Sequence, residues 1–261
     1  MNILGKIIQR KKLEVQEAKK NITIEELQET PLFNRTCYSL KQSVLDPGKN
    51  GIISEFKRAS PSKGIINDHS NVDEIAKAYE QNNVSAISVL TDHNFFKGSI
   101  EDLLAVRNAV KIPVLRKEFI IDPFQIAEAK AYGADIILLI AACLSSKEVN
   151  ELSAYAKKIG LNVLLEVHNE EELKENKFDT IDAIGVNNRN LNDFSVSIQH
   201  SLDLINLIPD QYIKVSESGI SNPETIQLLR NVGFQAFLIG ENFMKTNNPG
   251  KAIQEFIDQI N

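Results

Sequence analysis

The clearest chemical signal in the sequence is a carboxylate and an ammonium group two residues apart, Glu55 and Lys57, at the end of an apolar run that begins at Ile52. Side chains two residues apart on a β-strand point to the same side, so both groups would enter the space that this strand borders. A loop of serine, proline and glycine follows at 60–64 and predicts the end of the strand. Taken alone, such a pair is most often an ordinary ion pair in solvent.

The same arrangement returns at the ends of other apolar runs. The polar side chains there are Arg116 and Lys117 after the third run, Glu166 in the fifth, Asn187 and Arg189 after the sixth, and Glu217 after the seventh. If these ends meet in space, acids, bases and amides gather in one cavity, which is what proton-transfer catalysis requires. The fourth run ends only in apolar residues, at 138–140, and suits a pocket wall.

These side chains must be positioned by the apolar runs themselves, of which the sequence has eight. The runs are 52–56, 86–90, 114–115, 136–140, 163–167, 183–186, 212–216 and 236–239. They recur at roughly 20 to 33 residues, the spacing of a β-α repeat, because a parallel crossover takes a dozen or more residues and is usually helical. The intervals carry helical patterns, and Asp122-Pro123 and Asn222-Pro223 are typical helix starts.

Eight β-α units predict an α/β protein with a closed (β/α)8 barrel, the TIM-barrel architecture, as a single domain over residues 1–261. An open doubly wound sheet is the alternative, but no GxGxxG motif follows the first strand. Residues 1–48 precede the first strand and are patterned as helices, and we expect them to extend over the active-site face. The carboxyl ends of all strands of such a barrel converge on one face, so the charged side chains should meet there.

Glycines follow the last two apolar runs, at Gly219 and Gly240. A glycine leaves backbone amides accessible to an anion, and the loops after the seventh and eighth strands of such barrels often bind phosphate. Either glycine alone could merely turn a corner, but their occurrence at these two positions favours a phosphate site. The expected ligand is therefore a small phosphorylated molecule.

The composition of the 261-residue chain narrows the classes of partner. The formal net charge is −6 without a block of like charges, which argues against nucleic acid or an anionic membrane. Cys37 and Cys143 lie far apart and the four histidines are scattered, so neither a disulfide nor a metal site is expected. The first residues become charged too soon for a signal peptide and no run could span a membrane, which predicts a cytoplasmic protein.

Six motifs follow one another along the chain. They are EFKRASPSKG (55–64), SVLTD (88–92) with FFKGS (95–99), RKEF (116–119), LEVH (165–168), GVNNRNL (185–191) and SESGI (216–220). Together they resemble the indole-3-glycerol phosphate synthase family of tryptophan biosynthesis, and the resemblance runs from the N-terminal helix to the last one. It implies a carboxy-lyase that converts 1-(2-carboxyphenylamino)-1-deoxyribulose 5-phosphate to indole-3-glycerol phosphate, with loss of carbon dioxide and water and without a metal or organic cofactor.

The resemblance also implies roles for the matching residues. Lys117 would be the general acid for ring closure, and Glu166 a general acid or base in later steps. Lys57 would lie near the phosphate and carboxylate of the substrate, and Glu55 would hold the lysines. Arg189 would contact the carboxylate or stabilise the site. The other implied contacts are Asn187 and Glu217 with the reacting part, Ser218, Gly219, Gly240 and the backbone of Glu241 with the phosphate, and Ser60, Phe96, Phe119 and Leu138 around the aromatic ring.

Two further expectations concern the pKa of Lys117 and the class of protein. We expect burial among other cations to lower the pKa of Lys117 and to ease proton donation. Another phosphate-binding barrel enzyme is an alternative, such as a sugar-phosphate isomerase or an aldolase that forms a Schiff base on Lys117, and so is a barrel that binds without catalysis. The resemblance implies a phosphorylated small-molecule substrate, and it suggests other enzymes of tryptophan biosynthesis as protein partners.

Overall fold

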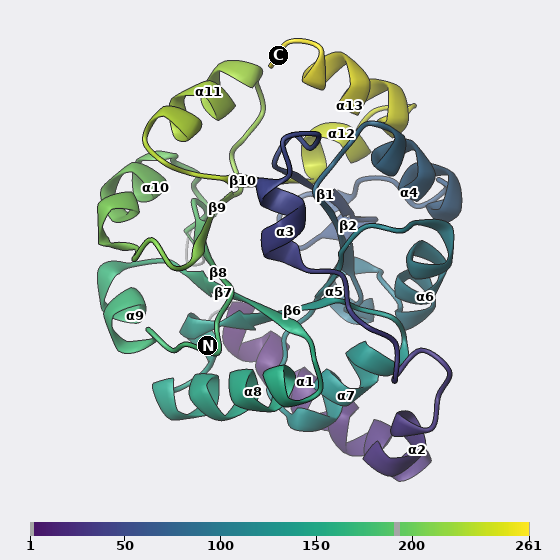
Figure 1. Ribbon diagram of the computed structural model, residues 1–261. Coiled ribbons are helices and arrows are strands. Elements are labelled where there is room, and N and C mark those ends of the chain that lie inside the picture. Colours follow the sequence, from purple (N-terminus) through teal and green to yellow (C-terminus); the bar gives the residue numbers. More distant parts are fainter. Residues whose placement is uncertain (1–2, 191–193, 261) are drawn as a thin grey trace.

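The computed structural model describes residues 3–190 and 194–260 and shows a closed barrel of parallel strands surrounded by helices (Figure 1). The barrel strands are β1 (Ile52–Phe56), β4 (Ala86–Leu90), β5 (Val114–Lys117), β6 (Ile136–Ile140), β7 (Asn162–Val167), β8 (Ala183–Asn187), β9 (Ile213–Glu217) and β10 (Ala236–Ile239). They follow one another in chain order, and β10 closes the barrel by pairing with β1. The predicted α/β class with a (β/α)8 barrel is therefore confirmed.

Each barrel strand is buried on both sides, and alternate residues serve two parts of the core. On β6, Ile137 and Leu139 belong to the outer core between strands and helices, whereas Ile136, Leu138 and Ile140 belong to the core inside the barrel. This period of two arises because helices cover one side of the strands and the barrel interior lies on the other. Inward-facing side chains beyond the last apolar layer therefore enter the space at the end of the barrel.

Helices connect the strands, and the sequence signals for their starts are confirmed. The longer ones are α4 (Val72–Gln81), α6 (Ile100–Ala109), α7 (Pro123–Ala131), α8 (Ser146–Lys158), α9 (Glu170–Glu175), α10 (Gln199–Leu204), α11 (Pro223–Asn231) and α13 (Pro249–Ile257). Shorter elements are α5 (His93–Phe96), α12 (Glu241–Met244), the 3-10 turns η1 (Ala141–Cys143) and η2 (Ile205–Leu207), and a hairpin of β2 (Ala59–Ser60) and β3 (Gly64–Ile65). The side chains of Asp122 and Asn222 cap α7 and α11, each with proline in the first turn.

Three helices precede the barrel, α1 (Ile3–Asn21), α2 (Ile24–Gln28) and α3 (Leu40–Leu45). α3 lies across the amino end of the barrel, where Leu40 and Val44 join the inner core and the Ser43 hydroxyl donates to the Ser85 carbonyl (Figure 1). α1 instead contributes side chains to the main pocket at the carboxyl end. The segment 1–48, expected over the active-site face, is thus divided between both ends, because the inner core also needs a cover where the strands begin.

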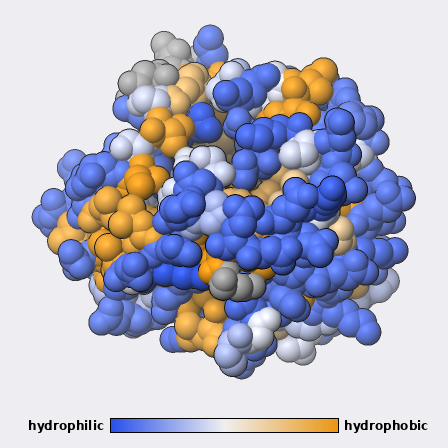
Figure 2. Space-filling model, turned by 90° about the horizontal axis from the view of Figure 1, so that it is seen from above, coloured by the Kyte–Doolittle hydropathy of each residue, from blue (hydrophilic) through white to orange (hydrophobic). Residues whose placement is uncertain are grey.

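The surface of the molecule carries few large apolar side chains. The face shown in Figure 2 is mostly hydrophilic, with apolar side chains in separate groups. Exposed examples include Leu13 on α1 and Leu228 on α11. None of the helices within the described residues has the length and apolar character needed to cross a membrane.

Asp135, just before β6, holds the segment between α2 and α3 against the barrel. Its carboxylate accepts hydrogen bonds at 2.6 Å from the guanidinium groups of both Arg35 and Arg107. It also accepts from the backbone amides of Tyr38 and Val114. Asp135 is fully buried and Arg107 nearly so. One buried carboxylate therefore provides the counter-charge for two guanidinium groups.

Asp135→Asn is expected to lower the free energy of unfolding by about 3 to 5 kcal/mol, because it leaves two guanidinium groups without their buried counter-charge. Urea unfolding curves measure this loss. Asp210→Asn is the matched control, since Asp210 is exposed and pairs with Lys214 at the surface, and should leave the free energy of unfolding almost unchanged. Similar losses for the two variants would contradict the importance of the buried cluster.

Candidate active site

A pocket opens at the carboxyl end of the barrel. The predicted site residues that line it are Glu55, Lys57, Ser60, Phe96, Lys117, Phe119, Leu138, Glu166, Asn187, Arg189, Glu217, Ser218 and Glu241. The other two, Gly219 and Gly240, line a neighbouring hollow that shares Lys57, Ser218 and Glu241 with the pocket. Residues distant in the sequence are thus gathered at one mouth of the barrel.

The period of two along each strand explains why these groups meet. Each charged group stands two residues after a member of the inner core: Glu55 after Ile53, Lys117 after Leu115, Glu166 after Leu164 and Glu217 after Val215. Arg116 has the opposite phase, and its guanidinium group donates to the Gln125 carbonyl and to Glu128 on α7. Its expected place in the cavity is therefore wrong, because its neighbour Lys117 occupies the inward position.

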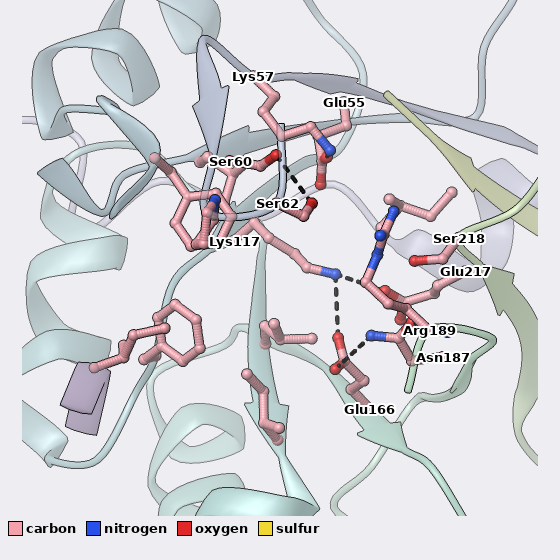
Figure 3. A pocket seen from close by; sticks show the side chains of 18 of the residues that line it. Glu55, Lys57, Ser60, Ser62, Lys117, Glu166, Asn187, Arg189, Glu217 and Ser218 are labelled. Atoms are coloured by element: carbon pink, nitrogen blue, oxygen red, sulfur yellow. Dashed lines mark hydrogen bonds and ion pairs between the residues drawn. The ribbon is translucent and has the colours of Figure 1, made fainter. Parts of the chain in front are cut away.

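The Lys117 ammonium lies at the centre of the charged side of the pocket (Figure 3). Its Nζ is 2.5 Å from Glu217 Oε2 and 3.2 Å from Glu166 Oε2. The side-chain amide of Asn187 donates to the other oxygen of Glu166 at 2.9 Å. Both carboxylates are buried, so these contacts are little weakened by solvent.

The charge state of Lys117 differs from the expectation. Burial by itself lowers the pKa of Lys117, but the charges of Glu217, Glu166 and Glu55 outweigh burial and raise the pKa above that of an ordinary lysine. The expected lowering was wrong because the neighbours of Lys117 are carboxylates and not cations. At neutral pH Lys117 is therefore an ammonium group, which can donate a proton or a hydrogen bond to a developing oxyanion.

The two acids beside Lys117 have opposite pKa shifts. Burial raises the pKa of Glu217 to about 7, against the opposing charge of Lys117 and with the support of the charge of Glu166. Burial acts in the same direction on Glu166, but there Lys117, His168 and the hydrogen bond from Asn187 bring the pKa below its usual value. Near neutral pH, Glu166 is thus ionised and Glu217 carries a proton part of the time. Two carboxyl groups separated in this way are the pattern of an acid and a base.

Glu55 and Lys57 form a second charged pair, with 2.9 Å between Lys57 Nζ and Glu55 Oε1. Burial raises the pKa of Glu55, but the charges of Lys57 and Lys117 outweigh it, so the pKa of Glu55 lies below its usual value. The pair predicted from the sequence is therefore part of the pocket and not a solvent-exposed ion pair.

Two glycines provide the space that the carboxylates need. A side chain at Gly185 on β8 would collide with Glu217 Oε1, and a Cβ at Gly240 would lie 2.7 Å from Glu55 Oε1. Gly240 was expected to expose its backbone to phosphate, and here it also makes room for an acid. The motif that contains Gly185 does not indicate this role, because it depends on Glu217 of the next strand around the barrel.

An apolar wall faces the charged groups. The rings of Phe96 and Phe119 lie with their centroids 6.0 Å apart, and Leu138 adds to the same pocket. The sequence did not assign part of this lining, which α1 supplies with Ile3, Leu4 and Ile7. The only signal for it was the amphipathic pattern of the N-terminal segment. This wall suits an aromatic ring, because it offers contact without polar groups to desolvate.

The hollow beside the pocket has the features of an anion site. Ser218 and Gly219 both adopt left-handed backbone, with φ of +67° and +76°. Lys63, from the loop after β1, also lines the hollow, and the sequence did not single it out. The cations of Lys63 and Arg189 each lie 3.9 Å from the Glu241 carboxylate. An anion in the hollow would thus meet several positive charges, although Glu241 opposes them.

The structure does not test the expectations for Leu191 and for cofactors. Leu191, the last residue of one motif, is outside the described residues. Over residues 3–190 and 194–260, no group of three or more His, Cys, Asp or Glu side chains could hold a metal ion, and both cysteines are free thiols. The absence of a metal or organic cofactor stays a prediction.

The sequence resembles known proteins over nearly its whole length. Residues 4–256 match the family model described as "Indole-3-glycerol phosphate synthase". Relatives of the same name include a protein of Bacteroides thetaiotaomicron, 46% identical over 99% of both chains. Others come from Polynucleobacter asymbioticus, 42% identical over 97% of this chain and 98% of the relative, and from Campylobacter jejuni subsp. doylei, 42% identical over 98% and 100%.

Solved structures support the fold independently. A 3-hexulose-6-phosphate synthase from Salmonella typhimurium superimposes with a TM-score of 0.62 at 12% identity, over 81% of this chain and 100% of the other. KGPDC from Streptococcus mutans gives 0.59 at 15% identity, over 80% and 96%. At such low identity the likeness concerns the fold alone. The family model and the relatives, however, cover almost every residue, and the chain therefore belongs to the indole-3-glycerol phosphate synthase family.

Proposed function

We propose a role for each of the main pocket residues in the reaction of the family. Ring closure, decarboxylation and dehydration convert 1-(2-carboxyphenylamino)-1-deoxyribulose 5-phosphate to indole-3-glycerol phosphate, carbon dioxide and water. The observation that carries the proposal is the position of the Lys117 ammonium, between Glu217 and Glu166 in a pocket beside the hollow that Gly219 and Gly240 line.

Lys117 serves the first step, ring closure. As the new carbon–carbon bond forms, the C2 carbonyl oxygen of the substrate becomes a hydroxyl and needs a proton donor beside it. The Lys117 ammonium supplies this proton, and its raised pKa means that the neutral amine is quickly protonated again. Glu217, 2.5 Å away and with a pKa of about 7, is placed to give the amine a new proton, after which its own carboxylate takes one from solvent.

Glu166 serves the later steps. Loss of carbon dioxide restores the aromatic ring, after which the hydroxyl must leave as water while the neighbouring carbon loses a proton. Glu166 is ionised at neutral pH and accepts this proton, while Asn187 holds the carboxylate in place. Lys57, held by Glu55, donates a proton to the departing hydroxyl.

The two ends of the substrate are held by different parts of the pocket. The backbone of Ser218, Gly219 and Gly240, together with Lys57 and Lys63, binds the phosphate in the hollow. Arg189 pairs with the carboxylate of the substrate. The aromatic ring lies against the apolar wall formed by Phe96, Phe119, Leu138 and the first turns of α1.

A Schiff-base aldolase is the second enzyme class that a buried lysine suggests. Schiff-base formation needs a neutral amine as nucleophile, and the raised pKa of Lys117 keeps it charged. Borohydride added with the substrate should therefore leave no adduct on the protein, as mass spectrometry would show. A trapped adduct on Lys117 would favour the aldolase class.

The proposal extends to the compartment and the partners of the protein. A phosphorylated substrate does not cross membranes freely, since moving its charge into hydrocarbon is strongly disfavoured. The enzyme should therefore lie in the cytoplasm with the enzyme that makes its substrate. Other enzymes of tryptophan biosynthesis are the partners to test for association.

The activity itself is tested by adding the anilino-ribulose phosphate and following the appearance of indole fluorescence. The chain contains no tryptophan, so the background of the protein is low. Tight binding without product would favour a non-catalytic barrel instead.

Lys117→Ala is expected to lower turnover by about 100-fold or more, the usual contribution of a positioned acid. Lys158→Ala, at an exposed position in the last turn of α8, is the control and should keep wild-type turnover. The fluorescence assay measures both, with circular dichroism to confirm folding. Turnover near wild type in folded Lys117→Ala would remove Lys117 from the role of acid.

Glu217→Gln should change how stability depends on pH. The pKa of Glu217 is about 7 in the folded protein against an ordinary 4.5, so its contribution to stability is full below about pH 4.5 and is lost as the pH rises to 7. As the pH rises from about 5 to about 8, the wild type should lose this contribution and the variant should not. The free energy of unfolding of the variant minus that of the wild type should therefore increase by about 1 to 3 kcal/mol. Urea unfolding at both pH values tests this, with exposed Glu224→Gln as control. An unchanged difference would argue against a raised pKa.

Gly219→Asp should weaken substrate binding, because it places a carboxylate against the phosphate. Any side chain here must also displace Val196, so Gly219→Asn serves as the neutral variant of the same shape. The KM of the aspartate variant should exceed that of the asparagine variant by about 10-fold or more. Equal KM values for the two variants would place the phosphate elsewhere.

A further inference from the structure

His168 is a largely buried histidine that none of the roles above uses. It follows β7, and its imidazole lies between two carboxylates, with Nε2 3.4 Å from Glu166 Oε1 and Nδ1 3.4 Å from Glu172 Oε2. The side chain is 13% exposed and is not part of the pocket lining. It therefore reaches one oxygen of Glu166 from behind the pocket, while Lys117 contacts the other oxygen.

We propose that His168 is a positioning residue for Glu166: the charge of its imidazolium, 3.4 Å from Glu166 Oε1 and behind the pocket, keeps this carboxylate ionised opposite Lys117. The inference rests on the role of proton acceptor proposed above for Glu166. It adds a residue that acts on the reaction without touching the substrate.

The groups around His168 favour its protonated form. Glu166 on β7, Glu172 on α9 and Glu217 on β9 all act on it as negative charges. Burial lowers the pKa of His168, but the contact with Glu172 and the charges of these glutamates outweigh burial and raise the pKa. The thiol of Cys143 in η1, close to the same glutamates, stays neutral, because burial raises its pKa to about 12.

The outer carboxylate, Glu172, is held in place by the start of α9. Its Oε2 accepts a hydrogen bond at 2.8 Å from the backbone amide of His168, and its Oε1 accepts one at 2.8 Å from the side chain of Asn169, the N-cap of the helix. Glu172 therefore has a fixed position in the first turn of α9. The imidazole thus lies in a clamp of two carboxylates, one fixed and one reacting, whose charges act across 3.4 Å without a hydrogen bond to either ring nitrogen among the described residues.

This clamp has a consequence for the pH dependence of the reaction. The charge of His168 acts with that of Lys117 to lower the pKa of Glu166. A neutral side chain at 168 would leave only Lys117 and Asn187 to do so. The pKa of Glu166 should then rise, and the reaction should lose its proton acceptor at a higher pH than in the wild type.

His168→Gln tests this through the pH profile of kcat. The midpoint of the acidic limb should move up by about one pH unit, the effect of removing an opposite charge at this distance. Turnover should accordingly fall more at about pH 6 than at about pH 8. His69→Gln is the matched control, because His69 is exposed beside Asp68, and its limb should not move. Lower turnover with an unshifted limb would mean only structural support and would overturn the inference.

A second measurement does not depend on the folding of His168→Gln. The imidazole of His168 is titrated by NMR in the wild-type protein. Its midpoint should lie above the ordinary histidine value of about 6.5 and should fall in Glu166→Gln; a midpoint at or below about 6.5 would overturn the inference. Turnover of Glu166→Gln separates the two proposals. Wild-type turnover in this variant would refute the role of Glu166 itself. Lost turnover in Glu166→Gln, together with an unshifted acidic limb in His168→Gln, would refute only the role of His168.

Discussion

The site depends on the burial of three carboxylates around one ammonium group at the end of the barrel. Glu55, Glu166 and Glu217 are all buried, and a buried charge without a counter-charge strongly destabilises a fold. Lys117 contacts two of them and Lys57 pairs with the third. The barrel interior below is apolar and needs no such balance. The strand ends can therefore hold reactive charges only as a mutually neutralised group, and this condition fixes their relative positions.

The same condition explains why two glutamates on one lysine have different proton affinities. Glu166 has support from Asn187 and His168 in addition to Lys117, so its ionised form is favoured. Glu217 has the shorter contact with Lys117, but its Oε1 is buried and has no hydrogen-bond partner among the residues that the structure describes. A buried oxygen without a donor favours protonation. The surroundings of the second oxygen thus add to the effect of burial, which is the main cause of the raised pKa of Glu217.

The fold and most of the site could be predicted from the sequence because they follow from local patterns. The period of two and the helix-start signals act over a few residues, and the barrel then brings the strand ends together. The predicted position of Arg116 in the cavity was wrong, because the prediction included side chains on both faces of the strand end. Only residues in phase with Leu115 point into the barrel. The pKa of Lys117 could not be deduced, because it depends on which side chains of other strands surround it. The role of His168 could not be predicted either, since its partner Glu172 belongs to the next helix.

The N-terminal helix shows how a segment outside the barrel can define part of the site. Lys11 on α1 is buried and pairs with Asp92 at 2.9 Å and with Glu118 at 3.0 Å. Asp92 caps α5, which carries Phe96, and Glu118 directly precedes Phe119. One cation therefore connects α1 to both loops that carry the aromatic pair. Because a buried ion pair is favourable only in a narrow range of geometries, the apolar start of α1 is placed by the same kind of charge balance that operates inside the pocket.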